Sequence, residues 1–163
     1  MNQLITLIEE SAIATSVREG DLLFPLIETL HILAVSLVFG SIMVVDLRLL
    51  GAASRARPVS RLTASILPVT WVAFVVAIGA GGLMFISKAH KYLENGYFDA
   101  KLVLIAAAGL NMMVFHLLTA RDIATWDTGA PPLGARIAGG LSMALWISVI
   151  TCGRLIGFTM PVG

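Results

Sequence analysis

Four long apolar stretches constrain the fold of this chain more than any other feature. They cover residues 23–50, 62–87, 100–120 and 137–158. A bilayer core about 30 Å thick requires roughly 20 apolar residues per helix, and each stretch is long enough. None alternates apolar and polar residues as a β-barrel strand would. Because 58% of the 163 residues are hydrophobic and only 13% are charged, the sequence predicts an all-α integral membrane protein.

Short connections set the expected topology of these helices. Residues 51–60, 88–99 and 121–136 join consecutive stretches and contain proline or glycine. Connections of this length place consecutive helices side by side in opposite directions. We therefore expect an antiparallel bundle of four transmembrane helices, forming one domain over residues 1–163.

The segment before the first stretch, residues 1–18, has a different pattern. Leu4, Ile5, Leu7, Ile8 and Ala12 recur at helical spacing. A signal peptide would begin with cationic residues, whereas this segment carries two glutamates. The pattern favours a short amphipathic helix lying on membrane lipids, with a flexible tail as the alternative.

Arginines and lysines are distributed unevenly between the two ends of the expected bundle. One end carries six arginines: Arg48, Arg55, Arg57, Arg61, Arg121 and Arg136. The other end carries Arg18, Lys88, Lys91 and Lys101. The positive-inside rule places the arginine-rich end in the cytoplasm and both termini in the periplasm of a bacterial inner membrane. The net charge of +1 gives no indication of nucleic-acid binding.

An ionisable side chain inside the first stretch, His31, is the first candidate for function. Counting outward from the cytoplasmic arginines at about 1.5 Å per residue places His31 and Arg154 at the same depth. The second stretch presents Gly79, Gly81 and Gly82 there, and Lys101 lies about a turn beyond on the third. An imidazole, two cations and a patch without side chains are what haem b requires: an iron ligand, propionate partners and space for the ring.

Each of these residues also has a structural interpretation. His31 can hydrogen-bond a backbone carbonyl or Glu28, Arg154 can reach the outer headgroups, and the glycines can serve helix packing. A second axial ligand is harder to find. His90 reaches the His31 layer only if the 88–99 loop folds back.

A second layer of candidate ligands lies near the cytoplasmic side. His116 is five positions from Arg121, and Met112 precedes it by one turn on the same helix face. Imidazole and thioether together suit Cu(I) or a histidine/methionine-ligated haem, although methionine is also a common core residue. Asp46 is expected to pair with a neighbouring arginine, or else to orient His116 or to handle a proton.

The fourth stretch carries small residues at four-residue intervals: Gly140, Ala144, Ser148 and Cys152, with Gly153 and Gly157 beside them. Such residues let two helices approach closely, within the bundle or between subunits. This pattern favours packing, and between chains it predicts a homo-oligomer. Since Cys152 is the only cysteine, an internal disulfide and a cysteine-ligated cluster are excluded.

The sequence also resembles a known family. The resemblance starts at His31-Ile-Leu-Ala, Phe39-Gly40 and the run from Asp46 to Gly51, and it continues through Pro68, Trp71, the 79–85 segment, Tyr92, Asn95, Phe98, Lys101, Asn111 and His116. These motifs resemble those of small bacterial four-helix membrane proteins whose function is uncharacterised. The glycine-rich second helix followed by a Tyr…Lys segment is distantly similar to CopD-like copper-resistance proteins, and the general plan is similar to bacterial four-helix cytochromes b.

Three functions are therefore open. The first is a haem b protein that transfers electrons, with a quinone or a redox protein as partner. The second is copper binding or transport, and the third is a non-catalytic subunit of an oligomer. An enzymatic activity is expected only as a membrane oxidoreductase, because the sequence has no nucleophile elbow, HExxH motif or phosphate loop. With three histidines, one chain cannot supply two histidine pairs to two haems.

Overall fold

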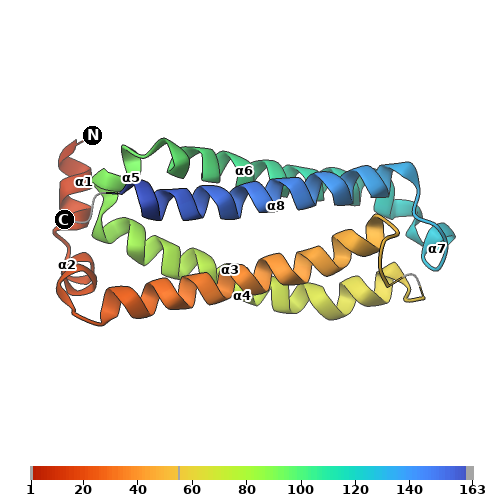
Figure 1. The fold of residues 1–163 in the computed structure, drawn as a ribbon, viewed down its shortest axis with the longest axis horizontal. Coiled ribbons are helices and arrows are strands. Elements are labelled where there is room, and N and C mark those ends of the chain that lie inside the picture. The colour runs from red at the N-terminus through yellow and green to blue at the C-terminus, as the bar shows by residue number, and fades with distance from the viewer. Residues whose placement is uncertain (1, 55, 161–163) are drawn as a thin grey trace.

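The structure is a computed structural model that describes residues 2–54 and 56–160. The described part consists of helices and their connections (Figure 1). Its α-helices are α1 (Asn2–Glu9), α2 (Ala12–Glu19), α3 (Leu23–Leu49), α4 (Val59–Ser87), α5 (Ala89–Leu93), α6 (Gly96–Val114), α7 (Ile123–Trp126) and α8 (Leu133–Thr159). A π-helical turn, η1 (Phe115–Thr119), and a 3-10 turn, η2 (Ala120–Asp122), connect α6 to α7.

Four of these segments are long and apolar enough to cross a membrane: Leu23–Leu49, Val59–Ser87, Gly96–Trp126 and Leu133–Thr159. They run in alternating directions, which confirms the predicted antiparallel bundle (Figure 1). The protein is therefore a multi-pass membrane protein. α3 packs along α4, α6 packs along α8, and the two pairs meet mainly where α3 contacts α8.

Three of the long helices begin three or four residues earlier than the apolar stretches predict. The Asn95 side chain accepts a hydrogen bond from the backbone N–H of Tyr97 and so starts α6 at Gly96. Proline precedes α4 and α8, at Pro58 and Pro132. These residues fix helix starts in polar sequence, beyond the reach of a hydropathy pattern.

Arg48 closes the end of the bundle that contains α7. Its side chain is fully buried, and its guanidinium donates hydrogen bonds to the backbone carbonyls of Arg57, at 3.0 Å, and Asp127, at 3.0 Å. Both connecting loops are thereby tied to α3. Arg48, counted among the arginines of the expected cytoplasmic end, has its side chain inside the bundle because these loop carbonyls draw it inward.

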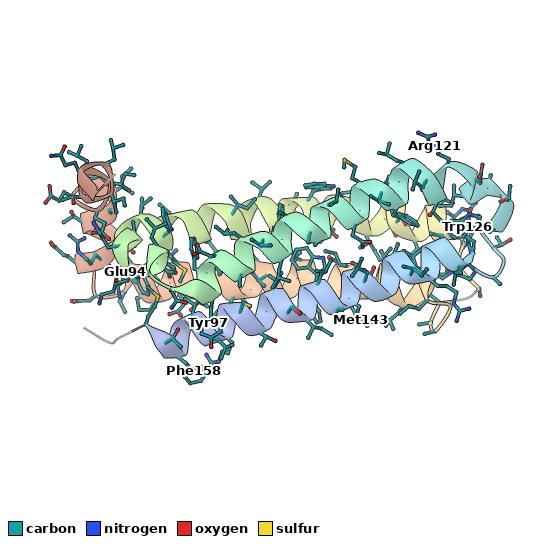
Figure 2. All side chains as sticks on the ribbon, turned by 90° about the horizontal axis from the view of Figure 1, so that it is seen from above. Glu94, Tyr97, Arg121, Trp126, Met143 and Phe158 are labelled. Carbon is teal, nitrogen blue, oxygen red and sulfur yellow. The ribbon has the colours of Figure 1, made fainter. Side chains whose placement is uncertain are left out.

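An apolar cluster lies beside this arginine. Leu49, Val59, Trp126 and Ala135 are buried together, with Val45, Phe115 and Ile123 packed around them. Figure 2 shows Trp126 and Arg121 at this end, and Glu94, Tyr97 and Phe158 at the other. This cluster separates the bundle interior from the solvent at the α7 end.

The first 18 residues form two helices instead of one. The Ser11 side chain accepts a hydrogen bond from the backbone N–H of Ala14 and begins α2. α1 and α2 lie across the end of the bundle that also contains α5 (Figure 1). Ala14 and Val17 are buried there, whereas Leu4 and Leu7 remain exposed. The apolar surface of α1 is therefore free to face lipid, as an interfacial helix requires.

Candidate functional site

His31 lies on α3 against α4, and its ring is held in one orientation. Its Nδ1 lies 2.9 Å from the carbonyl oxygen of Ala77. A carbonyl oxygen only accepts hydrogen bonds, so Nδ1 carries the proton. In the neutral ring, the lone pair is then on Nε2. A backbone carbonyl on one ring nitrogen is the arrangement that commonly orients a histidine whose other nitrogen binds a metal.

The glycine segment of α4 contacts His31 at one position. A Cβ atom added to Gly81 would lie 3.0 Å from His31 Cε1 and 3.2 Å from Nδ1. Gly79 and Gly82 are exposed, and a Cβ atom on either would meet nothing within 4 Å. The glycine patch expected around a porphyrin is thus divided: Gly81 makes room for the imidazole, and the other two face outward.

Lys101 from α6 approaches the same region. Its side chain is half-buried and lies in the neighbourhood of His31. A Cβ atom on Gly153 of α8 would lie 3.5 Å from the Lys101 Nζ. Glu28, which is exposed, also acts electrostatically on the imidazole. The structure therefore brings together His31, Gly81 and Lys101 of the expected haem site.

Arg154 points elsewhere. Its side chain is exposed, and its guanidinium lies over the ring of Phe158, 4.6 Å from the ring centroid. This cation–π contact lies near the end of α8 where Figure 2 places Phe158. The position agrees with an arginine that reaches toward the membrane surface.

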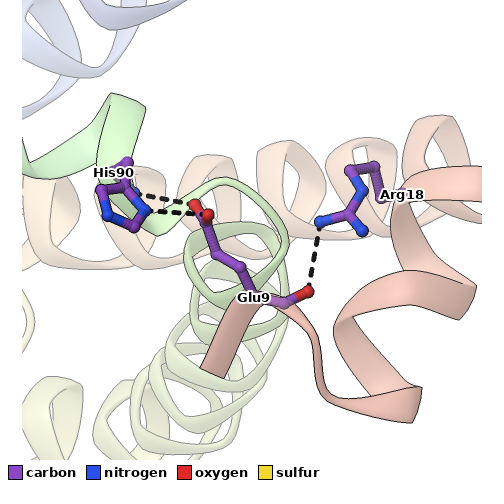
Figure 3. Close-up of polar contacts among 3 residues, drawn as sticks. All are labelled: Glu9, Arg18 and His90. Atoms are coloured by element: carbon purple, nitrogen blue, oxygen red, sulfur yellow. Dashed lines mark hydrogen bonds and ion pairs between the residues drawn. The ribbon is translucent and has the colours of Figure 1, made fainter. Parts of the chain in front are cut away.

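His90 lies on α5 and is paired with α1 (Figure 3). The Glu9 carboxylate accepts hydrogen bonds from the His90 backbone N–H and from Nδ1, both at 2.8 Å. Partial burial raises the pKa of Glu9, but the hydrogen bonds from His90 outweigh it and hold the pKa below its ordinary value. Arg18 donates to the Glu9 carbonyl oxygen at 3.1 Å. His90 therefore holds α1 and α5 together, a contact that joins residues 81 positions apart.

His116 and Met112 share an exposed face of the third spanning segment. His116 Nδ1 lies 2.8 Å from the Met112 carbonyl oxygen, so this nitrogen also carries the proton. The histidine belongs to the π-helical turn η1, and π-turns inside helices are frequent at functional sites. Across residues 2–54 and 56–160, no group of three or more His, Cys, Asp or Glu side chains is placed to hold a metal ion.

Among the described residues, Asp46 has no arginine paired with it, in contrast to the expected ion pair. Its side chain is only 4% exposed, and its neighbour Arg48 uses its guanidinium on loop carbonyls. The Ser142 side chain of α8 lies within hydrogen-bonding reach of the carboxyl group. Asp46 Oδ2 has no hydrogen-bond partner among the residues that the structure describes. Sequence reasoning missed Ser142, since a serine on an apolar helix has no distinctive pattern.

The small residues of α8 serve several neighbours. A Cβ atom on Gly139 would lie 3.0 Å from both the Asp46 carbonyl oxygen and Leu49 Cβ. Gly140 faces Leu50, and Gly153 faces Lys101. A Cβ atom on Gly157 would meet nothing within 4 Å. Part of the small-residue pattern is therefore used for packing within the chain.

An apolar groove of about 470 Å³ lies between α3 and α4. Its lining is aliphatic: Leu30, Leu33, Ala34, Leu37, Pro68, Val69, Val72, Ala73 and Val76. The groove begins at Leu30, directly beside His31 in the chain. Its lining offers only apolar contacts.

The arrangement around His31 meets part of what haem b requires. His31 Nε2 could serve as one axial ligand, and Lys101 could provide one cation for a propionate. Gly81 makes room for the His31 ring and not for a porphyrin. Because His90 and His116 are held elsewhere, the donor set suits a haem with a single protein ligand.

Comparison with known proteins gave one match. Residues 16–159 match the model of the family described as "Family of unknown function (DUF6644)". No curated protein and no solved structure gave a significant match. The match covers all four spanning segments and each residue of the candidate site. The chain is therefore a member of the DUF6644 family.

Proposed function

We propose that the protein binds haem b in the half of the bundle near α5 and transfers electrons across or along the membrane. His31 Nε2 would be the axial ligand, and the Lys101 ammonium would neutralise a propionate. When bound, the haem would supply a one-electron redox centre. The remaining steps belong to the chain: it orients the imidazole, screens the site from water and admits a partner.

The observation that carries this proposal is the hydrogen bond from His31 Nδ1 to the Ala77 carbonyl. It fixes the ring plane, keeps the proton on Nδ1 and leaves a lone pair on Nε2. A neutral imidazole oriented in this way is a prepared ligand inside a spanning helix, where an ionisable group is costly without a role.

The apolar groove supports a quinone as redox partner. It is lined entirely by aliphatic side chains and opens between α3 and α4, where a spanning pair faces lipid. A quinone carries a long hydrocarbon tail and reaches membrane proteins through the bilayer. The groove would hold this tail beside α3 and bring the ring near the His31 layer.

Charge distribution supports an orientation in a bacterial inner membrane. Four arginines at the α7 end are exposed: Arg57, Arg61, Arg121 and Arg136. Arg55 lies outside the described residues. At the other end Arg18 is exposed, while Lys101 is drawn into the bundle. The positive-inside rule then places the α7 end in the cytoplasm and α1 in the periplasm.

The test is the absorption spectrum of the purified protein before and after dithionite. We expect a Soret band that shifts on reduction, is lost in His31→Ala and is retained in His116→Ala. Added imidazole should restore the band in His31→Ala, because it fills the space of the missing ring. The proposal fails if haem-supplied protein shows no Soret band, or if His31→Ala keeps the wild-type spectrum.

Copper is distinguished in the same preparation by metal analysis. The copper function would be favoured over haem binding if the protein shows no Soret band, binds one copper ion per chain and loses this copper in His116→Ala. The matched pair of histidine variants therefore separates the two chemistries.

A further inference from the structure

The carboxyl group of Asp46 is buried within the bundle and has no charged partner among residues 2–54 and 56–160. Asp46 is 4% exposed and lies on α3, three residues before this helix ends. One of its oxygens, Oδ2, has no hydrogen-bond partner among the described residues. In a membrane protein, an ionised carboxylate left in this state costs several kcal/mol. The group therefore needs a ligand that neutralises it.

The surroundings of Asp46 are built by a close contact between α3 and α8. Gly139 lets the α8 backbone approach, because a Cβ atom there would lie 3.0 Å from the Asp46 carbonyl oxygen. Ser142 follows Gly139 by three residues, which places it on the same helix face. From this position, its hydroxyl lies within hydrogen-bonding reach of the Asp46 carboxyl. Gly139 and Ser142, on one turn of α8, thus both lie against Asp46.

Charged groups on the neighbouring elements do not neutralise this carboxyl. Arg48 donates to loop carbonyls. Arg61 on α4 and Arg136 on α8 are exposed. His116 on η1 is exposed as well, and its Nδ1 is engaged with Met112. One turn beyond Asp46, the cluster of Leu49, Val59, Trp126 and Ala135 covers the end of the bundle.

The small number of oxygen ligands distinguishes a proton from a metal cation. Hard cations take about six or more oxygen ligands. The side-chain oxygens named here are those of the Asp46 carboxyl and the Ser142 hydroxyl. No group of three or more His, Cys, Asp or Glu side chains that could hold a metal ion is found in the described chain. A proton needs only one lone pair, and Oδ2 has it free.

We propose that Asp46 and Ser142 form a proton-binding site inside the membrane-spanning bundle, with the proton on the Asp46 carboxyl and the Ser142 hydroxyl hydrogen-bonded to the same group. The site lies in the opposite half of α3 from His31, 15 residues along the helix, or about 22 Å. Buried acids in spanning segments often serve as proton relays. The site is independent of haem, and protein without haem is sufficient to test it.

The test is the infrared spectrum of the full chain in lipid nanodiscs at neutral pH. We expect the carbonyl-stretch band of a protonated carboxylic acid, which shifts when H2O is exchanged for D2O. The band should be absent in Asp46→Asn and unchanged in Asp122→Asn, which removes an exposed acid. Ser142→Ala should shift the band to higher frequency without removing it, because one hydrogen bond to the carboxyl is lost.

Three outcomes would overturn the proposal. The first is a wild-type spectrum without this band, and the second is a band that persists in folded Asp46→Asn. The third is a band that appears only after sodium and potassium are replaced by choline, since the site would then bind a cation. If Asp46→Asn does not fold, the shift in Ser142→Ala decides, because an unshifted band excludes the Asp46 carboxyl as its source.

Discussion

The Arg48 guanidinium hydrogen-bonds the backbone carbonyl of Asp127, 79 positions later in the sequence. Among the described residues, its guanidinium also donates to a third carbonyl oxygen, that of Gly129, at 3.5 Å. The arginine thus joins both loops of the α7 end to α3. A single fully buried residue organises the connections of all four spanning segments at this end.

Replacing Arg48 by Ala should destabilise the protein strongly. Without the guanidinium, the loop carbonyls lose their donors and a cavity opens beside the Trp126 cluster. We therefore expect the free energy of unfolding to fall by roughly 3 kcal/mol. Arg48→Lys should recover only part of it, because an ammonium cannot reproduce the fork of the guanidinium. Thermal unfolding in detergent measures both, with exposed Arg61→Ala as the control. An equal effect of Arg48→Ala and Arg61→Ala would contradict this role.

Asp127 should act as a helix cap for α4 supplied by a distant loop. Its carboxylate accepts from the Ser60 backbone N–H at 2.8 Å and from the Ser60 hydroxyl at 2.6 Å. The hydrogen bond from the Ser60 side chain lowers the pKa of Asp127 below its ordinary value. The stabilisation of the folded state by the Asp127–Ser60 contact is therefore complete above the ordinary pKa of an aspartate. It is lost as the pH falls through the lowered pKa of Asp127 in the folded state. Hydrogen exchange at the start of α4 should rise at acidic pH, and Asp127→Ala should remove this dependence by raising exchange at every pH.

The contact between Glu9 and His90 should hold α1 in place. Since the pKa of Glu9 is lowered, the contact persists above the ordinary glutamate value of 4.5 and weakens as the pH falls below it. Glu9→Gln should increase amide exchange and proteolysis in α1 at neutral pH. The neighbouring Glu10→Gln, which alters an exposed side chain, is the matched control. Equal protection of α1 in both variants would show that the helix is held by its apolar contacts alone.

The glycines of α4 provide a matched set around His31. Gly81→Ala should cost about 1–3 kcal/mol, because the new methyl group would lie 3.0 Å from His31 Cε1. Gly79→Ala and Gly82→Ala have open space and should be neutral or stabilising by up to about 1 kcal/mol. Thermal unfolding measures the difference. If haem is bound, Gly81→Ala alone should also shift the Soret band, and identical behaviour of all three variants would contradict the close contact.

The sequence could predict the spanning helices and their antiparallel order, because length and hydropathy determine both in a bilayer. Counting at a constant rise also placed His31 at the depth of Gly81. The rotation of each helix was beyond this reasoning. α4 is apolar on all sides, so no pattern indicates that Gly81 faces inward while Gly79 and Gly82 face outward. For the same reason, counting could give the depth of Arg154 but could not predict that its side chain points toward Phe158.

Contacts between distant polar groups were equally out of reach. The burial of Arg48 could not be predicted, because its hydrogen-bond acceptors are backbone carbonyls, which every residue carries. The sequence could suggest His90 only as a possible second haem ligand, because its partner Glu9 lies 81 positions away. The Ser142 neighbour of Asp46 depends on the close approach at Gly139. Each of these contacts is set by tertiary packing.

The division of the bundle into two packed pairs has a consequence for biosynthesis. α3 pairs with α4 and α6 pairs with α8, so each pair is continuous in sequence apart from its own loop. Contacts between near neighbours in sequence form early and at low entropic cost. The α3–α4 hairpin can therefore enter the membrane before the α6–α8 hairpin has been synthesised. The hydrogen bond between Arg48, on the first hairpin, and the Asp127 carbonyl, on the second, forms only after both are present.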